Sequence, residues 1–243
     1  MVDEFLKYVS AYDEQVDAIR FKKEHSLRVR MQAMKIAKQE GFTREECELA
    51  ELIGLLHDIG RFEQVKLYDS FDDANSIDHA EYGANVLFEE GLIERFTDKK
   101  EWYSVVEYAI RNHNKLELPK TSDSLSYKMG KMIRDADKLD IVYLLGVLGN
   151  YDSCEDDSSI SSEVSKCFFE RSCVKNEFVK TNNDKIASTM LLAFDINFDC
   201  CLKNMKEYLE AYFHRVRKSS NLDDLFGEVL KYMNERIDKN VRN

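Results

Sequence analysis

Residues that interrupt helices are scarce in this chain. Among 243 residues, Pro119 is the one proline and only nine are glycines, and these two types are the strongest breaks in helical structure. Apolar residues recur at steps of three and four along most of the sequence, and no segment shows sustained alternation. We therefore predict an all-α fold. The expected helices cover residues 4–20, 24–39, 43–58, 79–89, 99–113, 124–148, 161–174, 184–218 and 222–239.

Two segments lack this helical pattern. Residues 62–78 are rich in aspartate and form either a solvated loop or a lid over a site. Residues 151–162 are polar and rich in turn-forming types. We expect the second segment to separate a helical domain, residues 1–150, from supporting C-terminal helices, residues 151–243, with both parts packed into the same globule.

The charge and the apolar runs limit the classes of partner. A net charge of −11 and a pI near 5.1 argue against a general affinity for long nucleic acids, which requires a basic face. The apolar runs are too short to cross a bilayer, and the first ten residues lack the order of a secretion signal. We therefore expect a cytoplasmic protein that binds neither membranes nor long nucleic acids, with its six cysteines reduced.

Four of the five histidines lie on apolar helical faces. His25 is followed by apolar residues at helical steps, and His57 follows Gly54, which is small enough to let another helix approach closely. His79 and His113 lie on similar faces. A single histidine in such a place is usually a hydrogen-bonded core residue, but four in a chain with one other histidine indicate a shared site.

Two aspartates extend this set. Asp58 directly follows His57 at the end of an apolar run, where a buried charge requires compensation. In the segment around residue 137, Asp137 is in register with Ile133 and Ile141, whereas Asp135 lies about 200° away around a helix. Asp137 is therefore the acid expected to point inward.

The chemistry of these side chains indicates metal binding. Imidazole combined with carboxylate suits Mn, Fe, Co, Ni or Zn better than Mg or Ca, which prefer oxygen alone. Six ligands are more than one catalytic ion needs, and two divalent transition metal ions that share one bridging carboxylate account for the number.

In its ordered pattern H…HD…H…H…D, the chain resembles the HD-domain superfamily of metal-dependent phosphohydrolases, an all-α fold. The matching segments are "EHS" at His25, "GLLHDIGRF" around His57 and Asp58, and "RDADKLD" around Asp137. The resemblance covers about residues 19–148 and implies an HD-type metal-binding helical domain. It implies a first ion held by His25, His57, Asp58 and Asp137, and a second ion held by Asp58, His79 and His113. The glycine-tyrosine-proline signature of the cyclic-dinucleotide phosphodiesterase branch is absent.

We expect from this resemblance a phosphohydrolase that cleaves a phosphate ester or phosphoanhydride of a small molecule, such as a nucleotide. A water that bridges two ions loses a proton near neutral pH and becomes the nucleophile, while the ions stabilise developing charge. Asp58 would act as the bridging catalytic carboxylate. Arg61 and Lys115 are the basic residues expected to meet phosphate oxygens, with Lys138 a third candidate.

Other functions fit the same ligands. A mixed-valent di-iron oxygenase of the HD-domain type, which cleaves a C–C or C–P bond, has the same six-ligand pattern. A sensor or a binding protein with structural metals is a further alternative. The oligomeric state is open.

Overall fold

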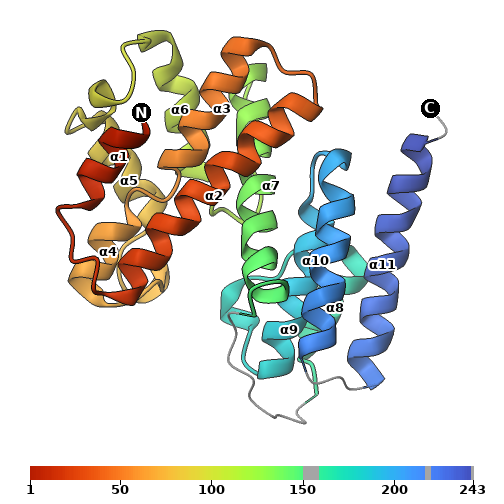
Figure 1. Cartoon of the computed structure of the whole chain (residues 1–243). Coiled ribbons are helices and arrows are strands. Elements are labelled where there is room, and N and C mark those ends of the chain that lie inside the picture. The colour runs from red at the N-terminus through yellow and green to blue at the C-terminus, as the bar shows by residue number, and fades with distance from the viewer. Residues whose placement is uncertain (150–158, 217–219, 242–243) are drawn as a thin grey trace. The chain divides into compact units, whose positions relative to one another are not determined.

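The computed structural model describes residues 1–149, 159–216 and 220–241 (Figure 1). These residues contain helices and no strand, so the all-α prediction is confirmed. Most of the expected segment 151–162 lies outside the described residues. The α-helices are α1 (Val2–Val9), α2 (Asp17–Gln39), α3 (Arg44–Leu56), α4 (Arg61–Tyr68), α5 (His79–Phe88), α6 (Tyr103–Asn112), α7 (Ser124–Gly146), α8 (Ser162–Glu170), α9 (Asn182–Leu191), α10 (Leu202–Arg215) and α11 (Ser220–Val241). Short 3₁₀-helices are η1 (Asp73–Asn75), η2 (Leu92–Arg95), η3 (Lys100–Trp102), η4 (Asn176–Phe178), η5 (Leu192–Asp195) and η6 (Asp199–Cys201).

The chain divides into two compact units, Met1–Asp137 and Lys138–Asn243, with the boundary inside α7. In the first unit α2 packs along α3 (Figure 1). A Cβ atom on Gly54 of α3 would lie 2.9 Å from the Cβ atom of Ala33 and 2.9 Å from the Cα atom of Arg30, both on α2. The prediction that Gly54 allows a close helix approach is therefore confirmed. The division into domains at residue 150, and their packing into one globule, stay predictions.

The core of the second unit lies among α9, α10 and α11. Leu191, Leu209 and Val229, one from each helix, are fully buried. Arg236 of α11 donates to the carbonyl oxygen of Ile196 at 2.7 Å, in the turns between α9 and α10. These contacts join the three helices by packing and by a side-chain hydrogen bond.

The first two predicted helices have the wrong boundary. One helix over residues 4–20 was expected, but α1 ends at Val9 and α2 begins at Asp17. In the connection, Ser10 Oγ donates to the carbonyl oxygen of Lys7 at 2.8 Å, and Asp13 Oδ1 accepts from the backbone nitrogen of Gln15 at 2.9 Å. Such local side-chain hydrogen bonds compete with helical ones. The connection between α1 and α2 contains neither glycine nor proline, so no residue of either type marks a break there.

The expected helix over residues 184–218 is also wrong, because α9 ends at Leu191 and α10 begins only at Leu202. Between them, Asn197 Nδ2 donates to the carbonyl oxygen of Asp195 at 3.2 Å, and Ile196 accepts from Arg236. Two 3₁₀-helices, η5 and η6, stand where the continuous α-helix was expected, and side-chain hydrogen bonds hold the turn that separates them.

Residues 62–78 are only partly irregular. The first part belongs to α4, which begins at Arg61, directly after the turn that holds His57 and Asp58. The irregular part follows α4 from Asp69, whose φ of 48° ends the helix in a left-handed conformation. Treating the whole segment as a loop was therefore wrong for its first half.

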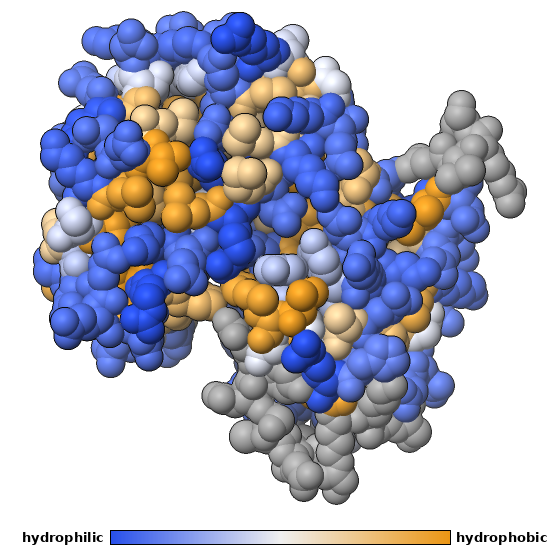
Figure 2. Space-filling view, viewed as in Figure 1, coloured by the Kyte–Doolittle hydropathy of each residue, from blue (hydrophilic) through white to orange (hydrophobic). Residues whose placement is uncertain are grey.

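The surface in view is mostly hydrophilic, with smaller apolar areas (Figure 2). Five cysteines lie in the described part, where Cys201 is buried and the other four, Cys47, Cys167, Cys173 and Cys200, are partly exposed. Within that part of the chain, none of the helices combines the length and the apolar character needed to cross a bilayer.

Candidate metal centre

The six predicted ligands come from five helical segments of the first unit. His25 lies within α2, and His57 and Asp58 follow the last residue of α3. His79 is the first residue of α5, His113 follows α6, and Asp137 lies within α7. The four imidazoles and Asp58 are buried, and the side chain of Asp137 is 19% exposed. The structure brings all six side chains together.

Two close helix contacts place these residues. A Cβ atom on Gly60 would lie 2.2 Å from the carbonyl oxygen of His79, and Gly83 of α5 lies against the same turn. No larger residue fits at position 60 without moving backbone. The close approach of α3 to α2 at Gly54 brings His57 near His25, and the Nε2 atoms of these two histidines lie 3.2 Å apart.

The two carboxylate oxygens of Asp58 face different donors. Oδ2 lies 3.4 Å from His25 Nε2 and 3.5 Å from His57 Nε2, and Asp137 Oδ1 lies 3.1 Å from that same His25 atom. Oδ1 lies 3.2 Å from His79 Nε2 and 3.5 Å from His113 Nε2. Asp58 thus stands between two groups of donors, one on each oxygen, and each group can hold an ion.

The other ring nitrogens fix the orientation of two imidazoles. His57 Nδ1 donates to the carbonyl oxygen of Gly54 at 3.0 Å, and His113 Nδ1 donates to that of Ile110 at 2.7 Å. Because a carbonyl oxygen only accepts, these Nδ1 atoms carry hydrogen, and in the neutral ring Nε2 presents a lone pair to the cluster. His79 Nε2 and His113 Nε2 are only 3.0 Å apart. Both atoms lie near Oδ1 of Asp58, and imidazole nitrogen combined with carboxylate oxygen suits a transition metal ion, so the residues present fit a metal ion.

The electrostatics of the cluster agree with a site for cations. Burial acts to raise the pKa of Asp58, but Lys22 and the neighbouring histidines outweigh it and hold that pKa well below the usual value. Burial also acts to raise the pKa of Asp137, but hydrogen bonds with His25 and His57 hold that pKa well below its usual value. Burial lowers the pKa of His113 to about 4. Asp58, which is buried, and Asp137, which is partly exposed, therefore carry negative charge that a cation can balance.

Part of this balance comes from the protein itself. The ammonium of Lys22 lies 2.7 Å from Asp58 Oδ2 and is only 12% exposed. Burial acts to lower the pKa of His79, yet hydrogen bonds to Asp58 and Asp73 raise it overall. Lys22 thus places positive charge beside Oδ2 of Asp58.

The predicted basic residues have protein partners. Arg61 Nη1 donates to Asp73 Oδ1 at 2.8 Å, and Arg61 Nε lies 3.7 Å from Asp58 Oδ1. The ammonium of Lys115 lies 2.8 Å from Asp78 Oδ2. Lys138 belongs to the second unit, where it pairs with Asp195 at 2.7 Å. The contact of Arg61 and Lys115 with a phosphate stays a prediction.

Sequence reasoning missed two residues at the site. Lys22 precedes His25 by one helical turn, a spacing that would have indicated the same face. Asp73 contacts Nδ1 of His79 at 2.7 Å from the irregular segment after α4, and no periodic signal in the sequence could have selected it. Helical phase placed Asp135 on the face opposite Asp137, but it did not predict that Asp135 is also fully buried.

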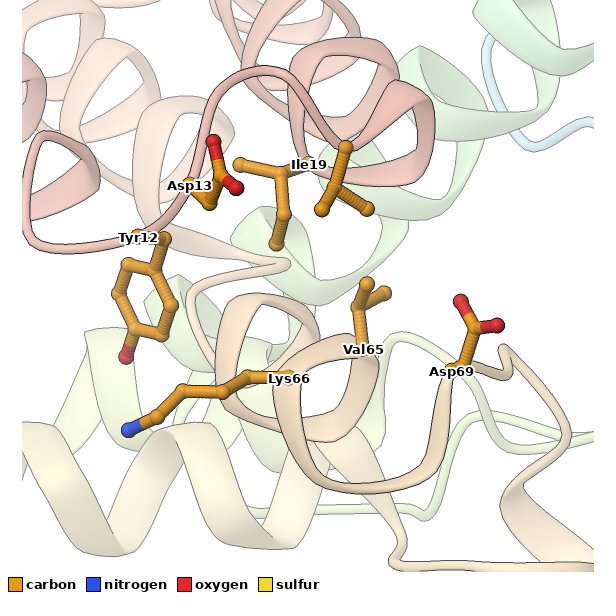
Figure 3. Close-up of a pocket in the computed structure, with 7 residues that line it drawn as sticks. Tyr12, Asp13, Ile19, Val65, Lys66 and Asp69 are labelled. Atoms are coloured by element: carbon orange, nitrogen blue, oxygen red, sulfur yellow. The ribbon is translucent and has the colours of Figure 1, made fainter.

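A pocket of about 360 Å³ lies between the start of α2 and α4, both in the first unit. Ile19 and Val65 face each other across it, with Tyr12 and Lys66 toward one end and Asp69 at the other (Figure 3). Ile19 precedes Lys22 on α2 by roughly one turn. The pocket therefore lies on α2, the helix that also carries Lys22 and the metal-ligand candidate His25.

An all-helical fold and a histidine-aspartate cluster whose ligand atoms could hold metal ions define a metal-dependent class of protein. Residues 23–141 match the family model described as HD domain. This part of the chain is therefore an HD domain, and it carries the His57-Asp58 pair and all other predicted ligands. An HD domain with such clusters implies metal-dependent, hydrolase-type activity. No curated protein and no solved structure matches the chain.

Proposed function

We propose that this chain is a metal-dependent phosphohydrolase that cleaves a phosphate ester or phosphoanhydride of a small molecule, such as a nucleotide. The observation that carries the proposal is the position of Asp58, whose oxygens each face a separate set of imidazole donors. A carboxylate in this position suits a bridge between two ions, and paired ions are typical of enzymes that transfer phosphoryl groups.

The residues divide between two ion positions. The first position is formed by His25, His57, Asp137 and Oδ2 of Asp58, and the second by His79, His113 and Oδ1 of Asp58. When bound, two transition metal ions supply Lewis acidity, which lowers the pKa of water and polarises phosphoryl oxygens. We propose Mn, Fe, Co, Ni or Zn because the donors are imidazole and carboxylate.

Two cationic side chains beside Asp58 are proposed to bind the phosphoryl group. Lys22 lies against Oδ2, and Arg61 lies near Oδ1. Arg61 Nε is buried and has no hydrogen-bond partner among the described residues. A donor in this state is available to a phosphoryl oxygen, and guanidinium groups bind such oxygens strongly. Lys115 is proposed as a further phosphate contact once its ammonium exchanges Asp78 for the substrate.

The pocket beside the start of α2 is proposed to hold the organic part of the substrate. Its apolar walls, Val16, Ile19 and Val65, exclude water from a small group, and its rim carries polar side chains. Asp13 and Asp69 at this rim repel a polyanion. A small phosphorylated molecule therefore suits the site better than a nucleic acid strand.

A substrate screen tests the proposal. Metal-free protein is loaded separately with Mn, Co, Ni, Zn and Fe, and phosphate release from nucleotides and simple phosphate esters is measured with and without oxygen. We expect phosphate release that depends on the metal and is equal in both atmospheres. Oxygen uptake with substrate and a mixed-valent iron signal, without phosphate release, would contradict the proposal and indicate the di-iron oxygenase.

The second ion position is tested by two variants. His79→Ala and His113→Ala each remove one of its donors. We expect each variant to lose at least about 100-fold in kcat, as when a group stabilising transition-state charge is removed. Turnover that survives unchanged in both variants would mean that this position is structural.

A further inference from the structure

The two ion positions have unequal donor sets. The position on the Oδ2 side of Asp58 includes a second carboxylate, that of Asp137. Among the described residues, the group on the Oδ1 side contains His79 and His113 besides the shared carboxylate. Negative charge and ligand number both raise the affinity for a divalent ion, so the second position must obtain support from elsewhere.

Asp73 is the carboxylate that contacts this second position through a histidine. Both oxygens of Asp73 face Nδ1 of His79, at 2.9 and 2.7 Å. Nε2 of the same ring points to Asp58. The histidine thus connects Asp73 to the cluster, while Asp73 itself lies outside the set formed by Asp58, His79 and His113.

Asp73 is itself held from three sides. Its Oδ1 accepts from Arg61 Nη1 at 2.8 Å and from Gln64 Nε2 at 2.9 Å, both on α4. Its Oδ2 accepts from Asn114 Nδ2 at 3.1 Å, next to His113 in the chain. Gln64 is fully buried. These contacts tie the carboxylate to the elements that carry Asp58 and His113.

A third ion beside Asp73 does not fit these contacts. Asp73, Asp78 and His79 lie close enough to hold a metal, but Arg61, Asn114 and Lys115 already donate to the two carboxylates. Three donors, two of them cationic, occupy the space around these oxygens. The group is therefore an ion-pair network that supports His79.

We propose that Asp73 is a positioning residue that sets the affinity of the second ion position without touching the ion. A carboxylate on Nδ1 fixes the orientation of the imidazole and increases the basicity of Nε2, and loss of such a partner typically weakens metal binding about 10–100-fold. The two positions then fill in order, with the Asp137 side first. This inference concerns metal binding alone and does not depend on the substrate proposed above.

The test is a titration of the metal-free full chain with Co²⁺, in the absence of substrate. Bound metal is measured after equilibrium dialysis, and the visible absorption of Co²⁺ reports the coordination at each step. We expect wild type to bind two equivalents. Asp73→Asn, which removes the charge, is expected to bind the first equivalent like wild type and the second about 10–100-fold more weakly.

Two further variants make the comparison specific. Asp72→Asn changes the neighbouring aspartate, which accepts from Ala74 N and Asn75 and does not contact His79, and should leave both equivalents unchanged. Asp73→Glu restores the charge and should recover part of the second affinity. If Asp73→Asn does not fold by circular dichroism, Asp73→Ser replaces it in the same comparison.

Several results of this titration would contradict the proposed role of Asp73. Equal binding of both equivalents by Asp73→Asn and wild type would overturn the inference. It would also be overturned if folded Asp73→Asn lost both equivalents together, if Asp73→Glu bound no better than Asp73→Asn, or if wild type bound a single equivalent. None of these outcomes involves phosphate release, so the substrate screen stands or fails separately.

Discussion

At the scale of single residues, the site is organised around the charge of Asp58. Its carboxylate is buried among four imidazoles and a second acid, and Lys22 gives it a direct cationic partner at 2.7 Å. A buried charge that loses its partner destabilises a protein strongly. Lys22 therefore has two roles. It balances the charge of Asp58 when no metal is bound, and it is proposed to bind the phosphoryl group of the substrate.

The first role predicts the behaviour of Lys22→Met. Without metal, this variant should unfold with a free energy about 3 kcal/mol below that of wild type, because Asp58 loses its partner. With saturating Mn²⁺, the ions supply the missing charge, and the difference should shrink. Urea unfolding with chelator and with Mn²⁺ measures both values.

Lys66→Met on α4 is the matched control. Its ammonium pairs with Glu63 at 3.0 Å, and its side chain is 58% exposed, so its loss should cost less than about 1 kcal/mol. An equal deficit for Lys22→Met with and without Mn²⁺ would show that Lys22 stabilises the fold by packing and not by balancing Asp58.

At the scale of elements, small residues decide how near the ligand-bearing helices come. Gly54 allows α3 to touch α2, and Gly60 allows the turn after α3 to touch α5. The first contact positions His57 beside His25, and the second positions Asp58 beside His79. Close backbone contacts between these elements thus help to set the geometry of the cluster.

Gly54→Ala tests this dependence. The added Cβ atom would meet Ala33 Cβ and Arg30 Cα at 2.9 Å, so we expect a loss of about 1–3 kcal/mol in the free energy of unfolding and weaker binding of the first metal equivalent. Gly227→Ala on α11 is the control, since nothing lies within 4 Å of its added Cβ. That variant should gain up to about 1 kcal/mol from helix propensity. Equal effects of the two substitutions would contradict the account of α2 and α3.

The start of α9 depends on one buried carboxylate. Asp184 accepts from the backbone nitrogens of Ser161 at 2.8 Å, Lys180 at 3.0 Å and Thr181 at 3.1 Å. Burial acts to raise the pKa of Asp184, but these three donors lower it overall from its ordinary value of 3.8. Because the folded-state pKa is the lower one, the stabilisation is complete above the ordinary value and is lost as the pH falls through the folded value.

Asp184→Asn should therefore be less stable than wild type by about 1–2 kcal/mol at pH 7, and the difference should shrink as the pH falls below the ordinary carboxyl pKa. Urea unfolding followed by circular dichroism from neutral to acidic pH measures this change. Asp223→Asn, at an exposed position in the first turn of α11, serves as control. A difference for Asp184→Asn that does not change with pH would contradict the role of its charge.

At the scale of the whole molecule, the sequence predicted what depends on periodicity. The all-α class was predicted correctly because helical faces repeat at regular steps in the sequence. The HD domain was predicted correctly because its ligands occur in a fixed order along the chain. The break after Val9 was missed because side-chain hydrogen bonds, and not glycine or proline, accompany the end of α1. The break after Leu191 was missed because the chain continues there through two 3₁₀-helices, which no glycine or proline marks. Asp73 was missed because its contact with His79 depends on how an irregular segment folds back over the site.

The central claim is that six side chains from five segments hold two ions with Asp58 between them. The most direct measurement is anomalous X-ray diffraction from crystals of the full chain loaded with Mn²⁺, with data collected at an energy above and an energy below the manganese edge. We predict two anomalous peaks, one beside His25, His57 and Asp137 and one beside His79 and His113, with an oxygen of Asp58 at each. A fully loaded crystal with no peak at this cluster, or with a single peak that Asp58 does not touch, would contradict the account.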